Sequence, residues 1–521
     1  MGELRGMEQS TAGVRDGGAR VQLRNWFAAP YDDAIAAART CYSPRVIHAD
    51  EITEGQRRRI GPLTYEGGHH TVYQHATFEF SLSGISRQLV WGFLHTFPFY
   101  NTEQQSQRYV RLDEIGAHIP ELQGEARTVY TGAIGRAWRA YAELSTRLEP
   151  LALGILGELW RLKDRQSVAF GRNVAREAEK KAIETARYVI PVACHTAMVY
   201  TVSGIVLHRL RRMVEVCDTP AEARVVVERM VGEVQKRDPN FFEAIGESPL
   251  SAEEVPELHA APAGFGDPSF AEGFDKSLAG SRSRLVDWSA RGPEVVAESV
   301  RSVLGRQDLS DDAALALVLD PACNRYRLDT LNVSAHSPLM RTLSHAHYTF
   351  RRKLSHTADS QDQRHRMVPA SRPLLTRTVP ATPDVVEPEL IAADPTCHAL
   401  FVETVEAAWA ARSRLLALGA TPEAALYVLP NALAVRYEES GSLLHLLHKW
   451  TLRTCLNAQR EIFEASMEEI AQVRAVHPQL MRHVGPPCSV RSGLASPRCS
   501  EGSHFCGIPV WRTFPRIERR I

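Results

Sequence analysis

One basic motif of this 521-residue chain is divided between two distant segments. Residues 104–109 read Gln-Gln-Ser-Gln-Arg-Tyr, and residues 361–366 read Gln-Asp-Gln-Arg-His-Arg. Arginine side chains and a serine hydroxyl are suited to hold an anionic group such as a phosphate, because they supply charge-assisted hydrogen bonds in fixed directions. Each segment contains what the other lacks. We infer that two copies of one unit have divided a single site between them.

The segments around the two motifs are related as well. Ser86 and Ser355 each follow a short aromatic stretch that alternates as a strand would. Nine residues after Ser355 stands Arg364, but nine residues after Ser86 stands His95. The basic triplet is therefore absent from the first copy.

A further repeat fixes the spacing of the two copies. Tyr-Val-Ile-Pro at 188–191 recurs as Tyr-Val-Leu-Pro at 427–430, an offset of 239 residues, whereas Trp26 and Trp288 are 262 residues apart. The unequal offsets indicate that the second copy is shorter in its middle. They favour a duplicated domain with loop insertions over a short-period solenoid.

The repeat divides the chain into five parts. We expect a disordered tail at 1–20, a first domain at 21–246, a linker at 247–282, a second domain at 283–483 and a cysteine-bearing tail at 484–521. The linker is rich in Pro, Gly, Ser and Ala and has little periodicity. With 44% hydrophobic residues the chain is long enough for two or three cores, since single cores stop growing near ~250 residues.

Periodicity predicts strands and long helices within each domain. Residues 76–82 alternate as a strand does, with Phe78 and Phe80 on one face. Helices are predicted at 31–41, 126–163, 173–188, 199–216 and 220–237 in the first domain, and at 293–304, 395–418, 442–455 and 457–474 in the second.

Composition bounds the partners and the compartment. Lys and Arg together number 61, as do Asp and Glu, so no net field would draw the chain to nucleic acid or to an anionic membrane. We find no apolar run long enough to span a bilayer and no signal-peptide core near the N-terminus, so we expect a cytoplasmic protein. Nine scattered cysteines do not indicate a disulfide scaffold.

Taken together, the motifs resemble the flavin-dependent thymidylate synthases. The resemblance rests on the block Gly-His-His-Thr-Val-Tyr-Gln-His at 68–75, on Ser86-Arg87, on the two motifs at 104–109 and 361–366, and on Asn-Ala-Gln-Arg-Glu-Ile at 457–462. It implies an α+β fold in two tandem copies, each a twisted antiparallel sheet with long helices, packed as a pseudo-dimer. Because the family assembles as tetramers, it also implies further dimerisation into a pseudo-tetramer.

The resemblance implies an enzyme that methylates dUMP to dTMP. Methylenetetrahydrofolate would donate the one-carbon group, and FAD would carry reducing equivalents from NADPH. Residues matching the family's dUMP ligands are Gln104, Gln105, Ser106, Gln107, Arg108, Arg187, Gln361, Arg364 and Arg453. Those matching its flavin contacts are His75, Arg364, His365, Arg366 and His448, and the catalytic pair would be Arg364 and Arg453.

The resemblance also implies one complementary site and one degenerate site. The first domain supplies Arg108 and Arg187, and the second supplies the triplet and Arg453. In the reverse pairing Leu426 stands where Arg187 stood, and Val214 falls near the position of Arg453.

Other interpretations remain open. The family's Asn-x-Arg flavin contact falls on residues 203–205 and 442–444, and neither segment contains an arginine. A nucleotide- or flavin-binding pseudoenzyme, or a scaffold derived from the family, is the alternative. His75 and His345 are equally compatible with histidines that only serve the core, and an isolated Arg-His-Arg triplet is often a solvated helix face.

The C-terminal tail carries a candidate metal site. Cys488, Cys499, His504 and Cys506 provide three thiolates and one imidazole, a sufficient tetrahedral set for a structural Zn²⁺. His483 is an equally available ligand. The alternative is a flexible tail of reduced thiols.

Overall fold

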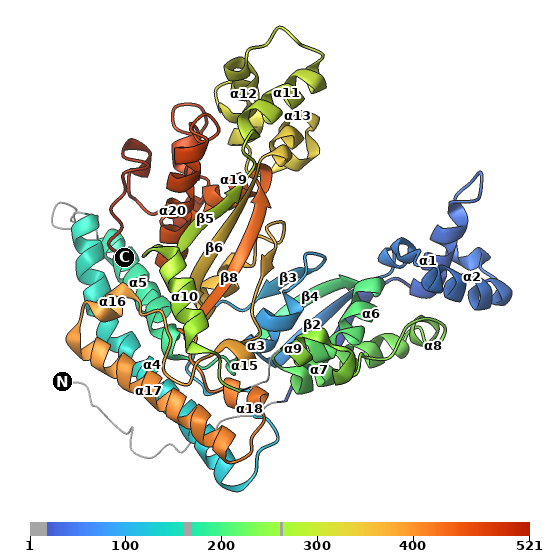
Figure 1. Ribbon diagram of the computed structural model, residues 1–521, viewed down its shortest axis with the longest axis horizontal. Coiled ribbons are helices and arrows are strands. Elements are labelled where there is room, and N and C mark those ends of the chain that lie inside the picture. Colours follow the sequence, from blue (N-terminus) through green and yellow to red (C-terminus); the bar gives the residue numbers. More distant parts are fainter. Residues whose placement is uncertain (1–17, 161–167, 261–263) are drawn as a thin grey trace.

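The computed structural model describes residues 18–160, 168–260 and 264–521 (Figure 1). Most of the predicted disordered tail, residues 1–17, lies outside the described residues, and its last position, Arg20, begins the first strand. Among the residues described, no helix is both long and apolar enough to cross a bilayer.

Each domain is built on a four-stranded antiparallel sheet, and the two sheets share one topology. The strand order is β1-β2-β4-β3 in the first domain and β5-β6-β8-β7 in the second. The strands are β1 Arg20–Trp26, β2 Thr77–Ser86, β3 Asn101–Gln104, β4 His195–Ser203, β5 Ser283–Trp288, β6 His347–Ser355, β7 Ala370–Ser371 and β8 Ala434–Ser442. The first strand pair of each sheet contains the same register shift, at 23–25 and at 285–287. The predicted duplicated α+β fold is confirmed.

Helices surround both sheets. In the first domain and linker they are α1 Pro30–Thr40, α2 Glu54–Glu66, α3 Arg87–Leu89, α4 Gly124–Leu159, α5 Val168–Ala186, α6 Gly204–Arg212, α7 Pro220–Gln235, α8 Asn240–Glu243, α9 Pro256–Ala260 and α10 Pro268–Leu278. In the second domain and tail they are α11 Gly292–Leu304, α12 Asp311–Leu319, α13 Pro338–Arg341, α14 His356–Asp362, α15 Leu375–Thr378, α16 Glu389–Ala392, α17 Pro395–Ala417, α18 Pro422–Leu426, α19 Leu443–Arg453, α20 Arg460–Val476 and α21 Pro487–Val490.

Two predictions need correction at this level. Residues 199–216 are not one helix, because β4 runs to Ser203 and α6 begins at Gly204. The segment predicted as a linker contains α9 and α10, and Asp275 in α10 forms ion pairs with Lys353 and Arg436 of the second sheet.

The two domains are related by a pseudo-twofold axis and share one hydrophobic cluster, beside the separate cluster that each buries on its own. The long helices α4 and α17 lie side by side (Figure 1) and bury Trp138, Tyr141 and Trp409 in a cluster that spans both domains. At the centre, Pro191 and Pro430, 239 residues apart, form an antiparallel bridge. The amide of Val192 donates to the Leu429 carbonyl and the amide of Asn431 to the Ile190 carbonyl, both at 2.8 Å. These reciprocal bonds are what an isologous interface between two copies requires.

Candidate functional site

Three first-domain arginines converge on the second domain. Arg87 begins α3 directly after β2, Arg108 follows β3, and Arg187 follows α5. The Nη2 of Arg108 donates to the carbonyl oxygen of Asn457 at 2.6 Å, and that of Arg187 to Oε1 of Gln459 at 2.6 Å. The sequence predicted this convergence of Arg108 and Arg187 with the second domain.

Glu184 of the first domain contacts two of these three arginines. Glu184 accepts from Nε of Arg108 at 2.8 Å, and its carbonyl oxygen accepts from Nε of Arg187 at 3.2 Å. The Nη2 of Arg87 donates to the Gln105 carbonyl at 2.6 Å. The Glu184 carboxylate therefore orients Arg108, while backbone carbonyls hold Arg187 and Arg87.

The second domain supplies Arg453 and the 361–366 motif. Arg453 ends α19, and its Nη2 donates to the carbonyl oxygen of Gln361 at 2.9 Å. Arg364 is exposed, and its side chain has no hydrogen-bond or ion-pair partner in the described part of the chain. The motif thus presents one guanidinium group to solvent beside another that is held by the backbone.

The other two residues of the triplet face the first domain and α19. The guanidinium carbon of Arg366 lies 4.9 Å from the ring centroid of Tyr100, and its Nη2 donates to Oδ1 of Asn101 at 3.3 Å. The ring of His365 lies 5.9 Å from that of His448. The structure thus brings His365 of the triplet beside His448.

The electrostatics of the site favour an anion. Burial, with the guanidinium groups of Arg187 and Arg364 acting in the same direction, lowers the pKa of Arg87 to about 10. Burial also lowers the pKa of Arg453 to about 10, with Arg108 and Arg364 contributing in the same direction. Because these five cations from two domains repel one another, a bound anion would relieve part of that repulsion.

Several buried polar atoms at this junction lack a partner within the described residues. They include Oε1 of Gln361, Nε2 of His365 and Nε of Arg453. Burial keeps the pKa of His365 well below its ordinary value, with Arg453 acting in the same direction, so its ring is neutral. Buried polar groups in folded proteins are nearly always hydrogen-bonded, so these atoms indicate a ligand site.

The geometry agrees with comparisons to known proteins. Residues 23–240 and 284–479 both match the family model described as thymidylate synthase complementing protein. The chain belongs to this family. The flavin-dependent thymidylate synthase of Clostridium tetani is 31% identical over 239 residues, which cover 44% of this chain and 88% of that protein. The same enzyme of Geobacter sulfurreducens is 32% identical over 169 residues, 32% of this chain and 70% of that protein.

One solved structure is similar at lower identity. The UMP/dUMP methylase PolB from Streptomyces cacaoi, bound with 5-Br dUMP, aligns with 44% of this chain and 94% of its own, at 17% identity and a TM-score of 0.32.

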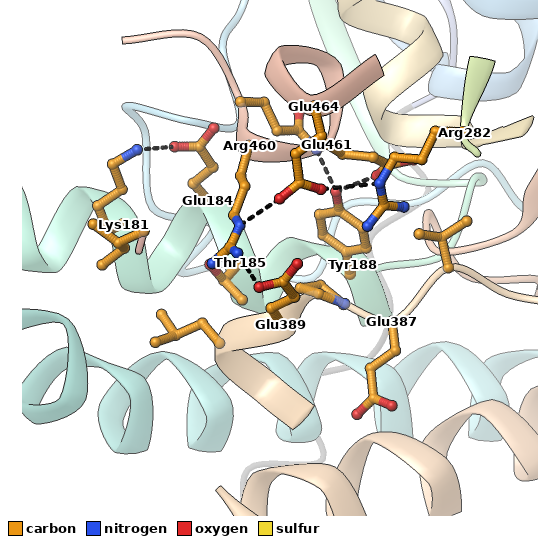
Figure 2. A pocket seen from close by; sticks show the side chains of 15 residues that line it. Lys181, Glu184, Thr185, Tyr188, Arg282, Glu387, Glu389, Arg460, Glu461 and Glu464 are labelled. Atoms are coloured by element: carbon orange, nitrogen blue, oxygen red, sulfur yellow. Dashed lines mark hydrogen bonds and ion pairs between the residues drawn. The ribbon is translucent and has the colours of Figure 1, made fainter. Parts of the chain in front are cut away.

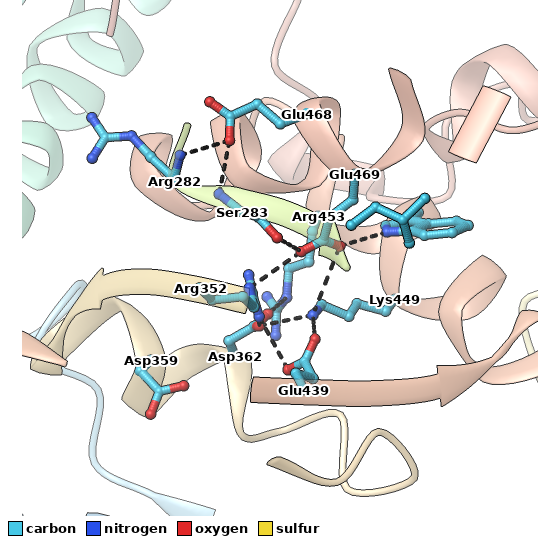
Figure 3. Close-up of polar contacts among 12 residues, drawn as sticks. Arg282, Ser283, Arg352, Asp359, Asp362, Glu439, Lys449, Arg453, Glu468 and Glu469 are labelled. Carbon is cyan, nitrogen blue, oxygen red and sulfur yellow. Dashed lines mark hydrogen bonds and ion pairs between the residues drawn. The ribbon is translucent and has the colours of Figure 1, made fainter. Parts of the chain in front are cut away.

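A buried ionic cluster lies behind the second-domain half of this family's site (Figure 3). Arg352, Asp362, Glu439, Lys449 and Glu469 are all buried and pair with one another. Lys449 Nζ lies 3.0 Å from Oδ2 of Asp362, and Arg352 Nη1 lies 3.0 Å from Oε2 of Glu439. Asp362 also lies 3.8 Å from Nε of the site residue Arg453, so the cluster reaches the site directly.

A pair of Ser–Glu–Tyr contacts joins the two domains behind the site. Tyr188 donates to Glu461 at 2.6 Å, and Ser355 Oγ donates to the same carboxylate at 2.7 Å. Figure 2 shows Tyr188 and Glu461 beside Glu184 at a small cavity of about 60 Å³. The residues equivalent to Tyr188 and Glu461 by the 239-residue offset are Tyr427 and Glu222. They repeat the arrangement, because Tyr427 donates to Glu222 at 2.5 Å.

The remaining predicted substrate ligands have other surroundings. The Oγ of Ser106 accepts from the Arg108 amide at 3.2 Å. Gln107 is buried and donates to Sγ of Cys194 at 3.4 Å, which is a structural contact. Gln104 ends β3.

The predicted flavin ligand His75 lies between Gln74 and Thr77, which line the same cavity as Arg366 of the triplet. It is exposed at the end of the 3₁₀ helix His70–Gln74, beside Asp33 of α1, whose pKa it lowers while burial raises that pKa overall. Its role stays a prediction.

Sequence reasoning missed three residues that the structure places at or beside the site. Arg87 and Gln459 were present in the family motifs without a role, so their position in those motifs was an available signal. Arg519, in the C-terminal tail, is buried and donates through Nη2 to the carbonyl of Ala458 at 2.5 Å, and the charge of Arg108 contributes to lowering its pKa. Nothing in the sequence around Arg519 indicates this.

The tail does not form the predicted zinc site. Cys488, Cys499 and Cys506 line a cavity of about 10 Å³, but the fourth cysteine there is Cys455, and the His504 side chain is exposed instead of lining it. Across the described ranges, no group of three or more His, Cys, Asp or Glu side chains could hold a metal ion. The tail is nevertheless anchored, since Nδ2 of Asn457 donates to the His504 carbonyl at 2.7 Å.

Proposed function

We propose that this chain methylates dUMP to dTMP at one composite site, with methylenetetrahydrofolate as one-carbon donor, FAD as cofactor and NADPH as reductant. The observation that carries the proposal is the convergence of Arg108 and Arg187 of the first domain with Gln361, Arg364 and Arg453 of the second. Family membership supports the same reaction class.

The first-domain arginines would bind the dUMP phosphate. Arg108 and Arg187 are oriented by Glu184, and Arg87 adds a third cation. A phosphate takes bidentate hydrogen bonds from guanidinium groups, and the partly buried setting strengthens them. Ser106 would add a hydroxyl donor.

The second-domain residues would bind the pyrimidine ring. The Oε1 of Gln361 and the Nε of Arg453 make no hydrogen bond within the described residues, so the first would accept from a ring N–H and the second would donate to a ring carbonyl. As C5 of the ring becomes nucleophilic, negative charge builds on the carbonyl oxygen. Arg453 would stabilise that charge, since its orientation is fixed by Asp362 and the Gln361 carbonyl.

The donor set near the triplet fits an anionic, ring-bearing cofactor. Arg364 is unpaired, Nε2 of His365 is buried without a partner, and Arg366 lines a cavity of about 330 Å³ together with Tyr100 and Arg209. Arg364 and Arg366 would face phosphate groups, and His365 and His448 would orient a ring. When bound, FAD would supply the redox chemistry, and the protein would orient the cofactor and supply the electrostatic environment.

One observation favours a second candidate, a nucleotide-binding pseudoenzyme. The cavity that Arg366 lines also contains Ser203, where the family's Asn-x-Arg contact would begin, and residues 203–205 contain no arginine. Loss of that contact would weaken flavin binding without touching the phosphate ligands. The pseudo-dimer would further dimerise in either case, which light scattering measures directly.

Flavin uptake and C5 proton release separate the two candidates. The purified protein is reconstituted with FAD, freed of excess and scanned for flavin absorbance, then given tritium-labelled dUMP, methylenetetrahydrofolate and NADPH. The synthase proposal expects bound flavin and tritium release that Arg453→Gln reduces by orders of magnitude. A colourless protein that binds dUMP would establish the pseudoenzyme, and a protein that binds neither ligand would overturn both.

A further inference from the structure

A cavity of about 450 Å³ lies in the first domain beside the π-helix Val90–Leu94. Its walls are largely aromatic and aliphatic: Trp91, Phe93, Phe97, Phe99, Val206, Leu210, Met213, Val216, Pro373 and Leu374. Ligand pockets have volumes of roughly 300–1,000 Å³ and mostly apolar walls, so this cavity is within the range of a small-molecule site.

The pseudo-twofold axis relates this cavity to the composite site. Ser86 and Ser355 are equivalent positions at the ends of β2 and β6, so Gly92 corresponds to Gln361 and Phe97 to Arg366. Glu103 and Ser371 pair with Val199 and Glu438, which are 239 residues apart.

The lining from the second domain follows from the same register. Arg372 corresponds to Gln104 and Leu374 to Ser106, while Met213 corresponds to Leu452. The cavity is therefore the second, degenerate site of the pseudo-dimer, in which Phe97 and Leu374 stand in place of Arg366 and Ser106.

The polar groups that line the cavity are mostly committed to the protein itself. Arg372 forms a bidentate pair with Asp359 at 2.6 and 2.8 Å. Asp218 accepts from the backbone amides of Leu375 and Thr376 at 2.9 and 2.7 Å.

The charges around the cavity balance. Arg209 and Glu257, both exposed, are the other two charged side chains of the lining. Two cations and two anions give the lining no net charge. A phosphate would have no free buried donor here, and burying it would carry a large desolvation cost.

We propose that this cavity is a second ligand site, which takes an uncharged aromatic molecule in place of an anionic nucleotide. The aromatic walls suit ring stacking, and the neutral lining selects against charge. The proposal rests on the pseudo-symmetry of the fold and on the cavity lining, and it does not require dUMP to bind at the composite site.

Nile red, a neutral aromatic fluorophore, tests the proposal on the full-length protein. We expect saturable binding of one dye per chain, unchanged when dUMP is present at saturation. Met213→Trp, which adds bulk at the cavity mouth, is expected to weaken dye binding at least tenfold. The matched control is Leu452→Trp at the pseudo-symmetric position, since Met213 and Leu452 are both 38% exposed.

Three outcomes would overturn the proposal. These are the absence of saturable dye binding, equal dye affinity in Met213→Trp and the wild type, and displacement of the dye by dUMP, which would place the dye in the composite site. Val216→Phe, a half-buried second variant, guards against a fold defect in the first. Because dUMP affinity is measured separately by calorimetry, failure of the composite site is distinguished from failure of this one.

Discussion

Five equivalent positions are ionic in the second domain and apolar in the first. The second domain buries Arg352, Asp362, Glu439, Lys449 and Glu469 as a network of ion pairs (Figure 3). The strand registers and the 239-residue offset place Leu82, Phe93, Tyr200, Leu210 and Met230 at the same positions of the first domain, and all five are buried. One fold thus accepts either kind of core.

The difference indicates what the ionic cluster is for. Replacing a buried ion network with apolar residues is often neutral or stabilising, so stability alone does not explain its presence. Asp362 is the neighbour of Gln361 and lies 3.8 Å from Nε of Arg453, whereas its mate Phe93 lines the apolar cavity. We infer that the cluster positions the second-domain half of the composite site.

The largest expected effect comes from breaking the cluster at one member. Arg352→Met leaves Lys449 as the one fully buried cation for Asp362, Glu439 and Glu469 among the described residues, so we expect a loss of about 3–5 kcal/mol in unfolding free energy. The equivalent change in the first domain, Leu82→Met, conserves volume and is expected to cost less than about 1.5 kcal/mol. Urea unfolding measures both. Equal losses would contradict the assignment of a distinct ionic core.

Transplanting the first-domain residues sharpens the same comparison. The fivefold variant Arg352→Leu, Asp362→Phe, Glu439→Tyr, Lys449→Leu and Glu469→Met removes every charge at once, so stability is expected to hold or to rise by about 1–4 kcal/mol. Its affinity for dUMP is expected to fall, because Arg453 loses Asp362. Unchanged dUMP affinity in a folded variant would show that the cluster does not position the site.

Substitutions at Arg108 and at the equivalent residue Thr376 allow the two ligand sites to be compared. Arg108→Ala is expected to weaken dUMP binding by about 1.5–3 kcal/mol, the range for a hydrogen bond to a charged group. Thr376 occupies the corresponding position of the degenerate site and contacts Asp218, so Thr376→Ala is expected to leave dUMP affinity unchanged. Calorimetry gives both values. A loss in both variants would mean that the phosphate is not bound at one composite site.

The sequence identified this asymmetry because short motifs carry it. Arg108, Arg187 and the 364–366 triplet are recognisable in the linear chain, and the two Pro-ending repeats gave the offset of 239. The ionic cluster was not predicted, because its members lie far apart in sequence and each could be a solvated charge. Only the sheet register brings Arg352 and Glu439 together.

The prediction of secondary structure from the sequence failed where the hydrophobic periodicity is ambiguous. Residues 199–216 are largely apolar with a basic end, and a buried central strand followed by a buried helix gives much the same pattern as one helix. The predicted linker has a composition typical of loops, yet α10 is fixed by tertiary ion pairs of Asp275. In both cases contacts from elsewhere in the fold decided the local structure.

The two interdomain tyrosines test the pseudo-symmetry itself. Tyr188 donates to Glu461 and Tyr427 to Glu222, while Ser355 and Ser86 satisfy the same carboxylates. Tyr188→Phe and Tyr427→Phe are each expected to cost about 1.5 kcal/mol, the low end for a bond to a charged group, because the serine contact remains. Losses of unfolding free energy that differ by more than twofold between the two variants would contradict the equivalence of the two positions.

The smallest expected effect is the pH dependence of stability that one buried histidine of the first domain contributes. His95 stands where the second domain has the exposed Arg364, and its ring is buried against Tyr100 at 4.7 Å. Burial, with Arg364, Arg87 and Arg366 acting in the same direction, lowers its pKa from 6.5 to about 3. The unfolded chain therefore binds a proton between pH 6.5 and 3 that the folded chain does not. Stability from this group is present above pH 6.5 and is lost as the pH falls below that value.

Between pH 6.5 and pH 5.5 the expected contribution of His95 is about 1 kcal/mol. His95→Gln removes the titrating group, so its unfolding free energy is expected to fall by about that much less than the wild type over the same interval. Replacing the exposed His345 by Gln provides the matched control, for which we expect the wild-type slope. An unchanged slope in His95→Gln would mean that His95 is not held as a buried neutral base. His95 would then be accessible to protons in the folded state, like the exposed Arg364 at the equivalent position.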